Sequence, residues 1–457
     1  MSTTSGAVKG NSTINVNQWF NGAELNGFHW MVFVLSLGII MFDGYDLFIY
    51  AGSIPLVMKE FHISPTMAGA IGSYMLAGAA IGALVLGSLA DVVGRKNALM
   101  WFAALFSVSM FLTGLTHGAT TFAICRFFTG LGVGGSLPNV TALASEYVPG
   151  RKRATIIATI YAGINVGGVV AALLSIWLFP HYGWRSVYFM GGIPLLVLPI
   201  YGKFLPESPV RLVRRNRLEK LRVFLRKARP QEIVPDNSVL EVEKGSGKAP
   251  IAAIFMEGRA LSTVLFWIIW FMNVYVIFGF TLWLPKLIMN HGFSLATGLS
   301  FLLALSAAAI VGSCIAGVIA DRVGTKPTLV GYYLLSFCSV GLVGFTGNYT
   351  YLMILVCLAG AGFNGAQNTM NSYMPPYYPP SMRSTATGVC YGLSRLGAIL
   401  GPLLIGALMT AHFSYRTTLF ALAGPSLIST IGIIAIQEKY SFSRKLAAEQ
   451  KALAQNA

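Results

Sequence analysis

Long apolar stretches separated by short polar segments dominate this chain. A helix needs about 20 apolar residues to cross the hydrocarbon core of a bilayer. Stretches of about that length occur at 28–50, 65–90, 97–117, 120–146, 154–178, 184–205, 260–284, 294–320, 328–346, 350–373, 384–411 and 416–437. The pattern predicts an all-α integral membrane protein with twelve transmembrane helices in two six-helix halves.

Polar residues divide the chain into five segments. We expect a tail at 1–27, a six-helix bundle at 28–205, a central loop at 206–258, a second six-helix bundle at 259–438 and a tail at 439–457. The central loop is rich in Arg and Lys. Its first part, 211–229, is predicted to form an amphipathic helix on the membrane surface, and 235–250 reads as a linker.

The composition excludes a water-soluble protein. Apolar residues make up 55% of the chain and charged residues only 11%, against roughly 25% charged residues in soluble domains. The formal net charge of +16 would suggest nucleic acid in a soluble protein. Here the basic residues lie between apolar stretches, so we interpret them as topology signals and expect no nucleic-acid partner.

The loops differ strongly in positive charge. The odd-numbered loops hold only Lys59, Arg185, Lys286 and Arg416, whereas the even-numbered loops and both tails hold the other Lys and Arg residues outside the helices. Because positive loops stay in the cytoplasm, we expect both termini and the central loop to be cytoplasmic.

The sequence contains no recognisable motif for several kinds of chemistry. The five cysteines form no CxxC pair, the six histidines do not pair at ligand spacing, and no P-loop or nucleophile–His–Asp set is readable. We therefore predict no metal, no cofactor, no ATP drive and no enzymatic activity.

The two halves share an internal repeat. Gly87-Ser-Leu-Ala-Asp91-Val-Val-Gly94-Arg95-Lys96 follows the second predicted span, and Gly317-Val-Ile-Ala-Asp321-Arg-Val-Gly324-Thr-Lys326 follows the eighth. Parallel repeats that enclose a substrate site are a common transporter design. The repeat therefore favours a transporter with its site between the halves.

These repeats resemble the loop 2–3 motif of the major facilitator superfamily. The stretches Arg126–Gly134 and Pro206–Pro209 resemble the superfamily's RxxxGxGxG and PESP motifs. Residues 163–168 lack the proline of the antiporter signature, which disfavours a drug/proton antiporter. The resemblance covers the whole chain and implies the major facilitator fold.

A narrower resemblance lies in the first span. Asp43-Gly44-Tyr45-Asp46 resembles the DGxD motif of the aromatic acid/proton symporters, with benzoate-type carriers nearest. Stretches in spans four, seven and eleven fit the same family. The resemblance implies a monomer in the bacterial inner membrane that imports benzoate, 4-hydroxybenzoate, protocatechuate or a similar acid, driven by the proton gradient.

Two aspartates lie deep within the first span. Asp43 and Asp46 are three residues apart and share a helical face. A charge at membrane depth costs at least ~2.5 kcal/mol on insertion scales, so the pair implies a polar cavity. We predict that both carry protons; a buried structural pair is the alternative.

Two arginines also lie within apolar stretches. Arg126 and Arg395 each offer a planar, permanently charged partner for a substrate carboxylate. We predict substrate binding for both, with one of them able to balance an aspartate. Helix packing or gating for Arg126, and an ion pair within its own half for Arg395, stay open.

The tenth span is unusually polar. Asn364, Gln367 and Asn371 share a helical face, and amides are costly in hydrocarbon. We expect them to line the cavity and bind a ring hydroxyl or carboxylate, with interhelical hydrogen bonds as the alternative. The candidates for stacking on a substrate ring are Tyr74, Tyr275, Phe278 and Trp283; packing or an interfacial belt is the alternative.

The repeated motifs suggest a gate. Small residues permit tight turns, and charge pairs can hold one conformation and release another. We assign a gating role to Gly87, Asp91, Gly94, Arg95, Glu146, Asp321, Gly324 and Arg383.

Two other functions compete with import of aromatic acids. One is proton symport of another small organic acid, such as muconate or shikimate, which the same arginines would suit. The other is a membrane sensor of aromatic acids. The short loop and tail leave little room for a signalling domain, which disfavours the sensor.

Overall fold

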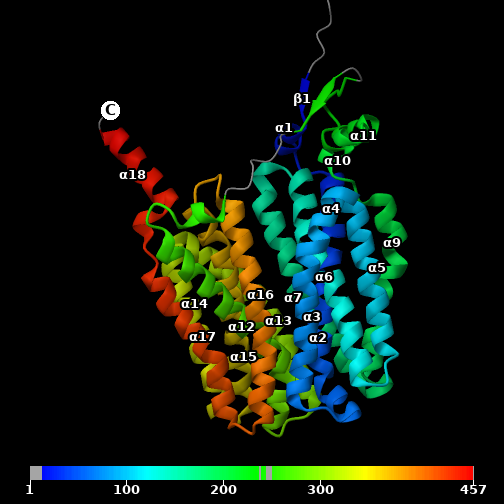
Figure 1. Cartoon of the computed structure of the whole chain (residues 1–457), viewed down its shortest axis with the longest axis vertical. Helices are drawn as coiled ribbons and strands as arrows, with labels where there is room; N and C mark the ends of the chain where they lie inside the picture. Colours follow the sequence, from blue (N-terminus) through cyan, green and yellow to red (C-terminus); the bar gives the residue numbers. More distant parts are fainter. Residues whose placement is uncertain (1–12, 236–237, 243–249, 456–457) are drawn as a thin grey trace, which may run out of the picture.

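The computed structural model describes residues 13–235, 238–242 and 250–455, so the first twelve residues of the predicted tail lie outside it. The first half of the chain forms α2 (Gly27–Phe61), α3 (Pro65–Ile81), α4 (Gly87–Val93), α5 (Arg95–Gly114), α6 (Ala119–Tyr147), α7 (Arg153–Tyr182), α8 (Arg185–Met190) and α9 (Ile193–Phe204). A π-helical turn, Gly82–Leu86, joins α3 to α4. Figure 1 shows these helices as one upright bundle.

The second half forms a matching bundle. It consists of α12 (Ala260–Asn290), α13 (Leu295–Val323), α14 (Thr325–Leu342), α15 (Tyr349–Tyr373), α16 (Arg383–Thr410) and α17 (Tyr415–Ala435). The last helix, α18 (Phe442–Gln455), leaves this bundle at the end where β1 lies (Figure 1). We call that end the terminal end and the opposite one the far end.

The helices match the predicted membrane spans. Within the described residues, eleven helical segments are long and apolar enough to cross a bilayer. The segment 119–147, α6, is not among them because Arg126 and several glycines lower its hydropathy, yet it is 29 residues long and lies inside the first bundle. The predicted all-α fold with two six-helix halves is confirmed.

Several helices differ in detail from the predicted spans. The first span was placed at 28–50, but α2 continues to Phe61, because a helix extends beyond the hydrocarbon into the interface. The sixth span is divided at Gly191 and Gly192 into α8 and α9.

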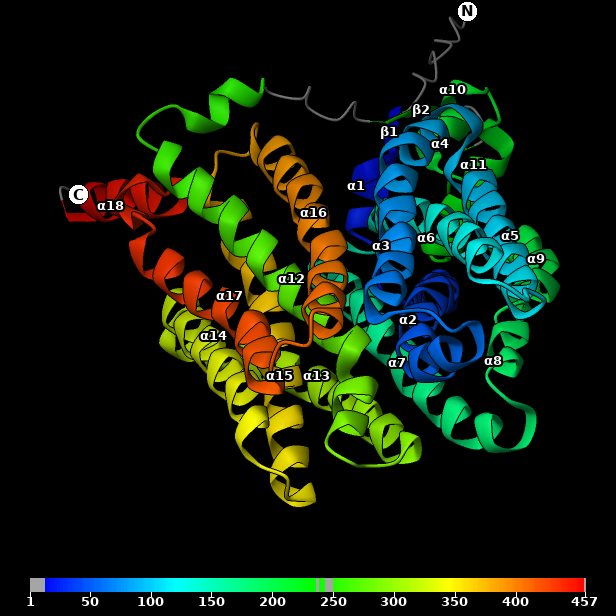
Figure 2. The ribbon, with the colours of Figure 1, turned by 60° about the horizontal axis from the view of Figure 1, so that its bottom comes forward.

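The halves meet closely at the far end. Thr66 of α3 donates its hydroxyl to Thr410 of α16 over 2.8 Å, and Ser73 donates to the carbonyl of Ile399 over 2.6 Å. The described hydrogen bonds between the halves all join α3 to α16. Figure 2 shows these two helices side by side at the boundary of the bundles.

A small cap covers the terminal end of the first bundle. β1 (Thr13–Asn15) pairs in parallel with β2 (Val239–Glu241), next to α1 (Val16–Asn21), α10 (Pro209–Arg214) and α11 (Leu218–Ala228). The predicted single helix at 211–229 is therefore wrong: Asn216 adopts a left-handed conformation, φ 54°, and separates two short helices. The predicted linker contains β2.

Candidate functional site

A cavity of about 230 Å³ lies between the two halves. Four helices of each half line it: α2, α3, α6 and α7 from the first, and α12, α13, α15 and α16 from the second. Its ionisable and amide groups are Asp43, Asn165, Asn364, Gln367, Asn368, Asn371 and Arg395, and its aromatic side chains are Phe48, Tyr161, Trp270, Phe278 and Tyr391. The repeat therefore places a mixed polar and aromatic cavity at the boundary of the halves.

The amide face of α15 lines this cavity. Gln367 accepts a hydrogen bond from the Asn273 amide over 2.5 Å, and Asn371 accepts one from the Tyr391 hydroxyl over 2.6 Å. Asn364 donates to the carbonyl of Gly360 in its own helix, over 3.1 Å. All three amides line the cavity. Gln367 and Asn371 also join α15 to other helices, as the alternative expected, whereas binding of a substrate group stays a prediction.

Arg395 enters the cavity from α16. Its side chain is half-buried and makes no hydrogen bond or ion pair with any residue that the structure describes. It interacts by charge with Asp43 of the opposite half. A guanidinium in this position retains its five N–H donors for a carboxylate ligand.

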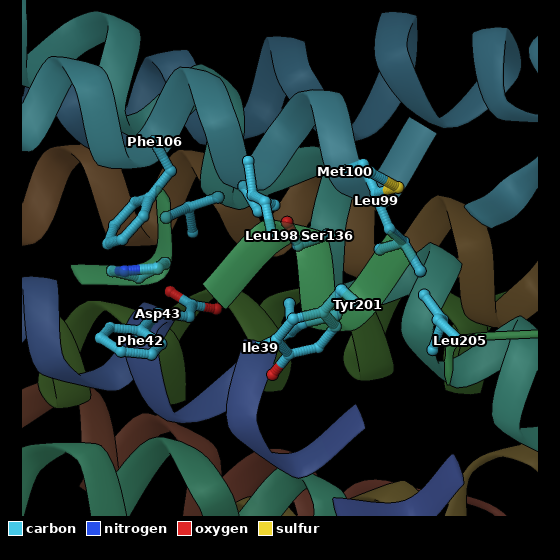
Figure 3. Close-up of a pocket in the computed structure, with 13 residues that line it drawn as sticks. Ile39, Phe42, Asp43, Leu99, Met100, Phe106, Ser136, Leu198, Tyr201 and Leu205 are labelled. Atoms are coloured by element: carbon cyan, nitrogen blue, oxygen red, sulfur yellow. The ribbon is translucent and has the colours of Figure 1, made fainter. Parts of the chain in front are cut away.

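Asp43 borders two cavities. Besides the cavity between the halves, it lines a narrower one inside the first bundle with Phe42, Ser136 and Tyr201, whose open volume is about 30 Å³. That volume admits about two water molecules. Figure 3 shows the Asp43 carboxylate directed into this narrower cavity.

Asp46 lies in a different environment. It is fully buried and forms an ion pair with Arg126 of α6, which is buried as well. The guanidinium also lies 4.8 Å from the centre of the Tyr50 ring. One carboxylate oxygen of Asp46 and the Nε of Arg126 have no hydrogen-bond partner among the described residues.

Gly44 allows this arrangement. A Cβ atom at Gly44 would lie 1.9 Å from the carbonyl oxygen of Ile164 in α7, so only glycine permits this approach of α2 and α7. On either side of this contact, Asp43 borders the cavity and Asp46 pairs with Arg126 inside the bundle.

Three predicted substrate contacts lie outside the cavity lining. Arg126 is held by Asp46 within the first bundle. Trp283 is fully buried, and its indole donates to the carbonyl of Pro402 over 2.9 Å. Tyr275 is buried and does not border the cavity, and its backbone carbonyl lies against Gly401. None of the three side chains borders the cavity in this conformation, and their substrate contacts stay predictions.

Of the five aromatic side chains that line the cavity, sequence reasoning named Phe278 as a stacking candidate and overlooked the other four, Phe48, Tyr161, Trp270 and Tyr391. Trp270 and Tyr391 have ring centres 4.6 Å apart. Trp270, Val274, Phe278 and Thr281 recur at the spacing of one face of α12, a signal that could have identified them. Tyr161 and Asn165 of α7 show the same i, i+4 spacing.

The comparisons with known proteins agree with this architecture. The sequence model of the Major Facilitator Superfamily matches residues 36–342 and 302–455. The chain belongs to the major facilitator superfamily. Its fold is similar to the solved structures of a bacterial homologue of the human lysosomal transporter Spinster and of a D-xylose–proton symporter, each with a TM-score of 0.72. The Spinster homologue is 16% identical to this chain, and the match covers 92% of this chain and 99% of that one. The D-xylose–proton symporter is 17% identical, and the match covers 91% of this chain and 100% of that one.

The similar curated proteins are transporters of aromatic acids. The chain is 38% identical to the benzoate transport protein of Acinetobacter baylyi, over 93% of both chains. It is 30% identical to a gallate transporter and 31% identical to the 4-hydroxybenzoate transporter PcaK, both of Pseudomonas putida, over 92% of this chain and 95% of theirs. The resemblance stated from the motifs and the prediction of a multi-pass inner-membrane protein are confirmed.

The two superfamily loop 2–3 motifs adopt the same backbone conformation. Gly94 and Gly324 both have φ of 100°, with ψ of 144° and 153°. Only glycine adopts this region readily. Each glycine ends one helix and begins the next, which explains its presence in both repeats.

The charged residues of the two loop 2–3 motifs differ in their ion pairs and exposure. Arg95 forms an ion pair with Glu146 of α6. Asp321 is exposed to solvent, Gly87 opens α4, and the side chain of Asp91 lies outside the described part of the chain. The structure thus joins two of the predicted gating residues, and the gating role itself stays a prediction.

Sequence reasoning missed a symmetric set of contacts at the terminal end. Lys96 donates to the carbonyl of Gly202 near the end of α9, and Lys326 donates to those of Ile434 and Ile436 at the end of α17. Arg383 at the start of α16 donates to the carbonyl five residues earlier, as Arg153 does in the first half. The repeat therefore fastens the last helix of each half in the same way.

Proposed function

We propose that this chain imports small aromatic carboxylates together with protons by alternating access. One observation carries the proposal: Arg395 lies half-buried in the cavity between the halves, without an ion-pair partner among the described residues and within the electrostatic reach of Asp43. An anion site next to a protonatable carboxyl group is what symport of an acid with a proton requires. The names of the relatives, transporters of benzoate, gallate and 4-hydroxybenzoate, support this substrate class.

The cavity suits a flat ring with one carboxylate. Arg395 binds the carboxylate through paired N–H donors. Trp270, Phe278 and Tyr391 provide faces and edges for ring stacking. Amides on α15 supply partners for ring hydroxyls. Muconate and shikimate have no aromatic ring to stack, so these side chains favour the aromatic acids over them.

Asp43 carries the proton. It borders both cavities, so water and substrate can reach it. Asp46 stays ionised in its pair with Arg126, because a guanidinium remains charged and stabilises the neighbouring carboxylate. One titrating carboxyl group gives one proton for each substrate anion, and the transfer is then electroneutral.

The conformation corresponds to one side of the transport cycle. The halves are joined at the far end through α3 and α16, so access to the cavity is from the terminal end. With both termini in the cytoplasm, as the loop charges indicate, this state faces inward. The transporter acts as a monomer, without cofactor or metal, and catalyses no chemical reaction.

Uptake measurements test the proposal. Cells that express the chain are given labelled benzoate, 4-hydroxybenzoate or muconate, with and without a protonophore, and cells with the empty vector serve as the control. We expect accumulation of the two aromatic acids that the protonophore abolishes. Preferential accumulation of muconate would overturn the substrate class, and binding of benzoate without uptake would favour a sensor.

A further inference from the structure

A second concave site lies at the terminal end of the first bundle, apart from the transport cavity. It has a volume of about 250 Å³ and is formed by α4, the start of α5, and α10 with the residues directly before and after it. Its lining consists of Ala90, Val92, Gly94, Arg95, Ser208, Val210, Arg211, Arg214 and Arg215. Figure 2 shows α4 and α10 close together at this end of the bundle.

The described side chains of the site include four arginines, of which two pair with a described carboxylate. Arg95 pairs with Glu146, and Arg211 pairs with Glu207 over 2.8 Å. Arg214 and Arg215 are exposed and form no ion pair with any carboxylate that the structure describes. With respect to the described side chains, these two guanidinium groups can bind an anion, and their paired N–H donors match the oxygen atoms of a phosphate.

The site also has an apolar side. Val92 and Val210 line it and are 68% and 49% exposed. Val85, two helical turns before Val92, is 61% exposed as well. An exposed valine strip that descends from a basic pocket along a membrane-spanning segment is suited to an acyl chain. A free, hydrated phosphate would gain nothing from this strip.

The position agrees with the membrane interface. α10 follows directly after α9, the last part of the sixth span, and α4 ends the second span. Both elements therefore reach the polar boundary of the bilayer, where lipid phosphates lie. Basic pockets between helices at this level bind anionic headgroups.

We propose that this pocket binds the phosphate group of an anionic phospholipid such as phosphatidylglycerol. Arg214 and Arg215 bind the phosphate, and an acyl chain lies along Val92 and Val85. The bound lipid lies beside the loop 2–3 motif, because Gly94 and Arg95 of that motif line the pocket. The proposal does not depend on the identity of the transported acid.

Thermal unfolding of the purified full chain in detergent tests the site. The probes are phosphatidylglycerol, phosphatidylcholine, glycerol 3-phosphate and inorganic phosphate. We expect only phosphatidylglycerol to raise the unfolding temperature in a saturable manner. In the Arg214→Gln/Arg215→Gln variant, the half-saturating lipid concentration should rise about tenfold, equivalent to ~1.4 kcal/mol.

The matched control removes two charges from the same cap. Arg217 and Lys220 are exposed and lie outside the pocket lining, so Arg217→Gln/Lys220→Gln should bind phosphatidylglycerol like the unmodified chain. Val210→Asp places a carboxylate inside the pocket and should also weaken binding, which keeps the test valid if the double Arg variant fails to fold.

The remaining outcomes overturn the proposal. An equal response to phosphatidylcholine would show that anionic charge is not recognised. An equal response to inorganic phosphate or glycerol 3-phosphate would reveal a soluble-anion site instead of a lipid site. An unchanged half-saturating concentration in both pocket variants would place the lipid elsewhere. Uptake of aromatic acids is measured separately, so a failure of either proposal is recognisable on its own.

Discussion

Asp43 and Asp46 lie three residues apart on α2, yet they occupy different environments. Asp43 borders the cavity between the halves and a second cavity inside the first bundle, whereas Asp46 is sealed in an ion pair with Arg126. Of the two carboxyl groups of this motif, that of Asp43 is therefore accessible from the cavities, and the charge of Asp46 is compensated by Arg126. This difference predicts different consequences for the two substitutions.

Asp43→Asn should abolish accumulation of substrate against a gradient, because asparagine keeps the size of the side chain but cannot release a proton. Exchange of labelled for unlabelled benzoate across proteoliposomes should continue, since exchange needs no net proton transfer. Asp43→Glu is the matched control and should retain part of the accumulation. Full concentrative uptake by Asp43→Asn would refute its role as the proton carrier.

Asp46→Asn should instead affect stability. Removal of one partner of a buried ion pair leaves the other charge uncompensated and costs ~3–5 kcal/mol. We expect a lower unfolding temperature and less folded protein in the membrane. In Asp46→Asn/Arg126→Met, both charges are absent and much of the stability should return. If Asp46→Asn folds normally and loses only proton coupling, Asp46 rather than Asp43 is the carrier.

Arg126→Lys and Arg395→Lys should each reduce uptake at least about tenfold, because an ammonium group cannot replace a planar fork of donors. The causes should differ. Arg395→Lys should raise the KM for benzoate with normal amounts of folded protein, since its contact is with substrate. Arg126→Lys should lower the unfolding temperature, because its contact is with Asp46. Unchanged uptake kinetics in both variants would show that neither guanidinium binds the substrate carboxylate.

The sequence predicts the fold well because the bilayer imposes a simple rule. Each membrane crossing needs one long apolar stretch, and the duplicated loop motif relates the two groups of six predicted spans. The same rule cannot detect β1 and β2, since three-residue strands far apart in the chain leave no local pattern. Hydropathy marks α6 less strongly than the other spans, because Arg126 interrupts the apolar stretch 120–146 that predicts it.

The candidate site was predictable only in part, for a similar reason. Charged and amide residues at membrane depth are costly, so Asp43, Arg395 and the amides of α15 stand out in the sequence. Aromatic residues carry no such cost. Trp283 and Trp270 therefore look alike as sequence, and only the rotation of α12 buries the first against Pro402 and turns the second toward Tyr391.

Gly94→Ala and Gly324→Ala should both destabilise the protein, because φ of 100° strains any residue with a Cβ atom by ~1–3 kcal/mol. Gly94→Ala should cost more, since the new Cβ would also displace the Arg211 guanidinium, whereas the nearest atom at Gly324 is 3.7 Å away. Gly87→Ala is the control: Gly87 is helical with open space around it. Equal unfolding temperatures for the three variants would contradict this account.

The number of protons can be measured from the response to voltage. A benzoate-type anion alone is driven out of a cell with a negative interior, at ~2.3 kcal/mol per charge for each 100 mV, so import requires at least one proton. With Asp46 held by Arg126, only Asp43 titrates and the transfer carries no net charge.

Uptake into proteoliposomes should then respond to a pH gradient but not to an inside-negative potassium diffusion potential. The Asp43→Asn variant, which cannot couple, is the control. Stimulation by the potential alone would reveal two protons for each anion and a second titrating carboxyl group, with Asp46 the first candidate. Uptake that ignores both gradients would replace symport with uniport.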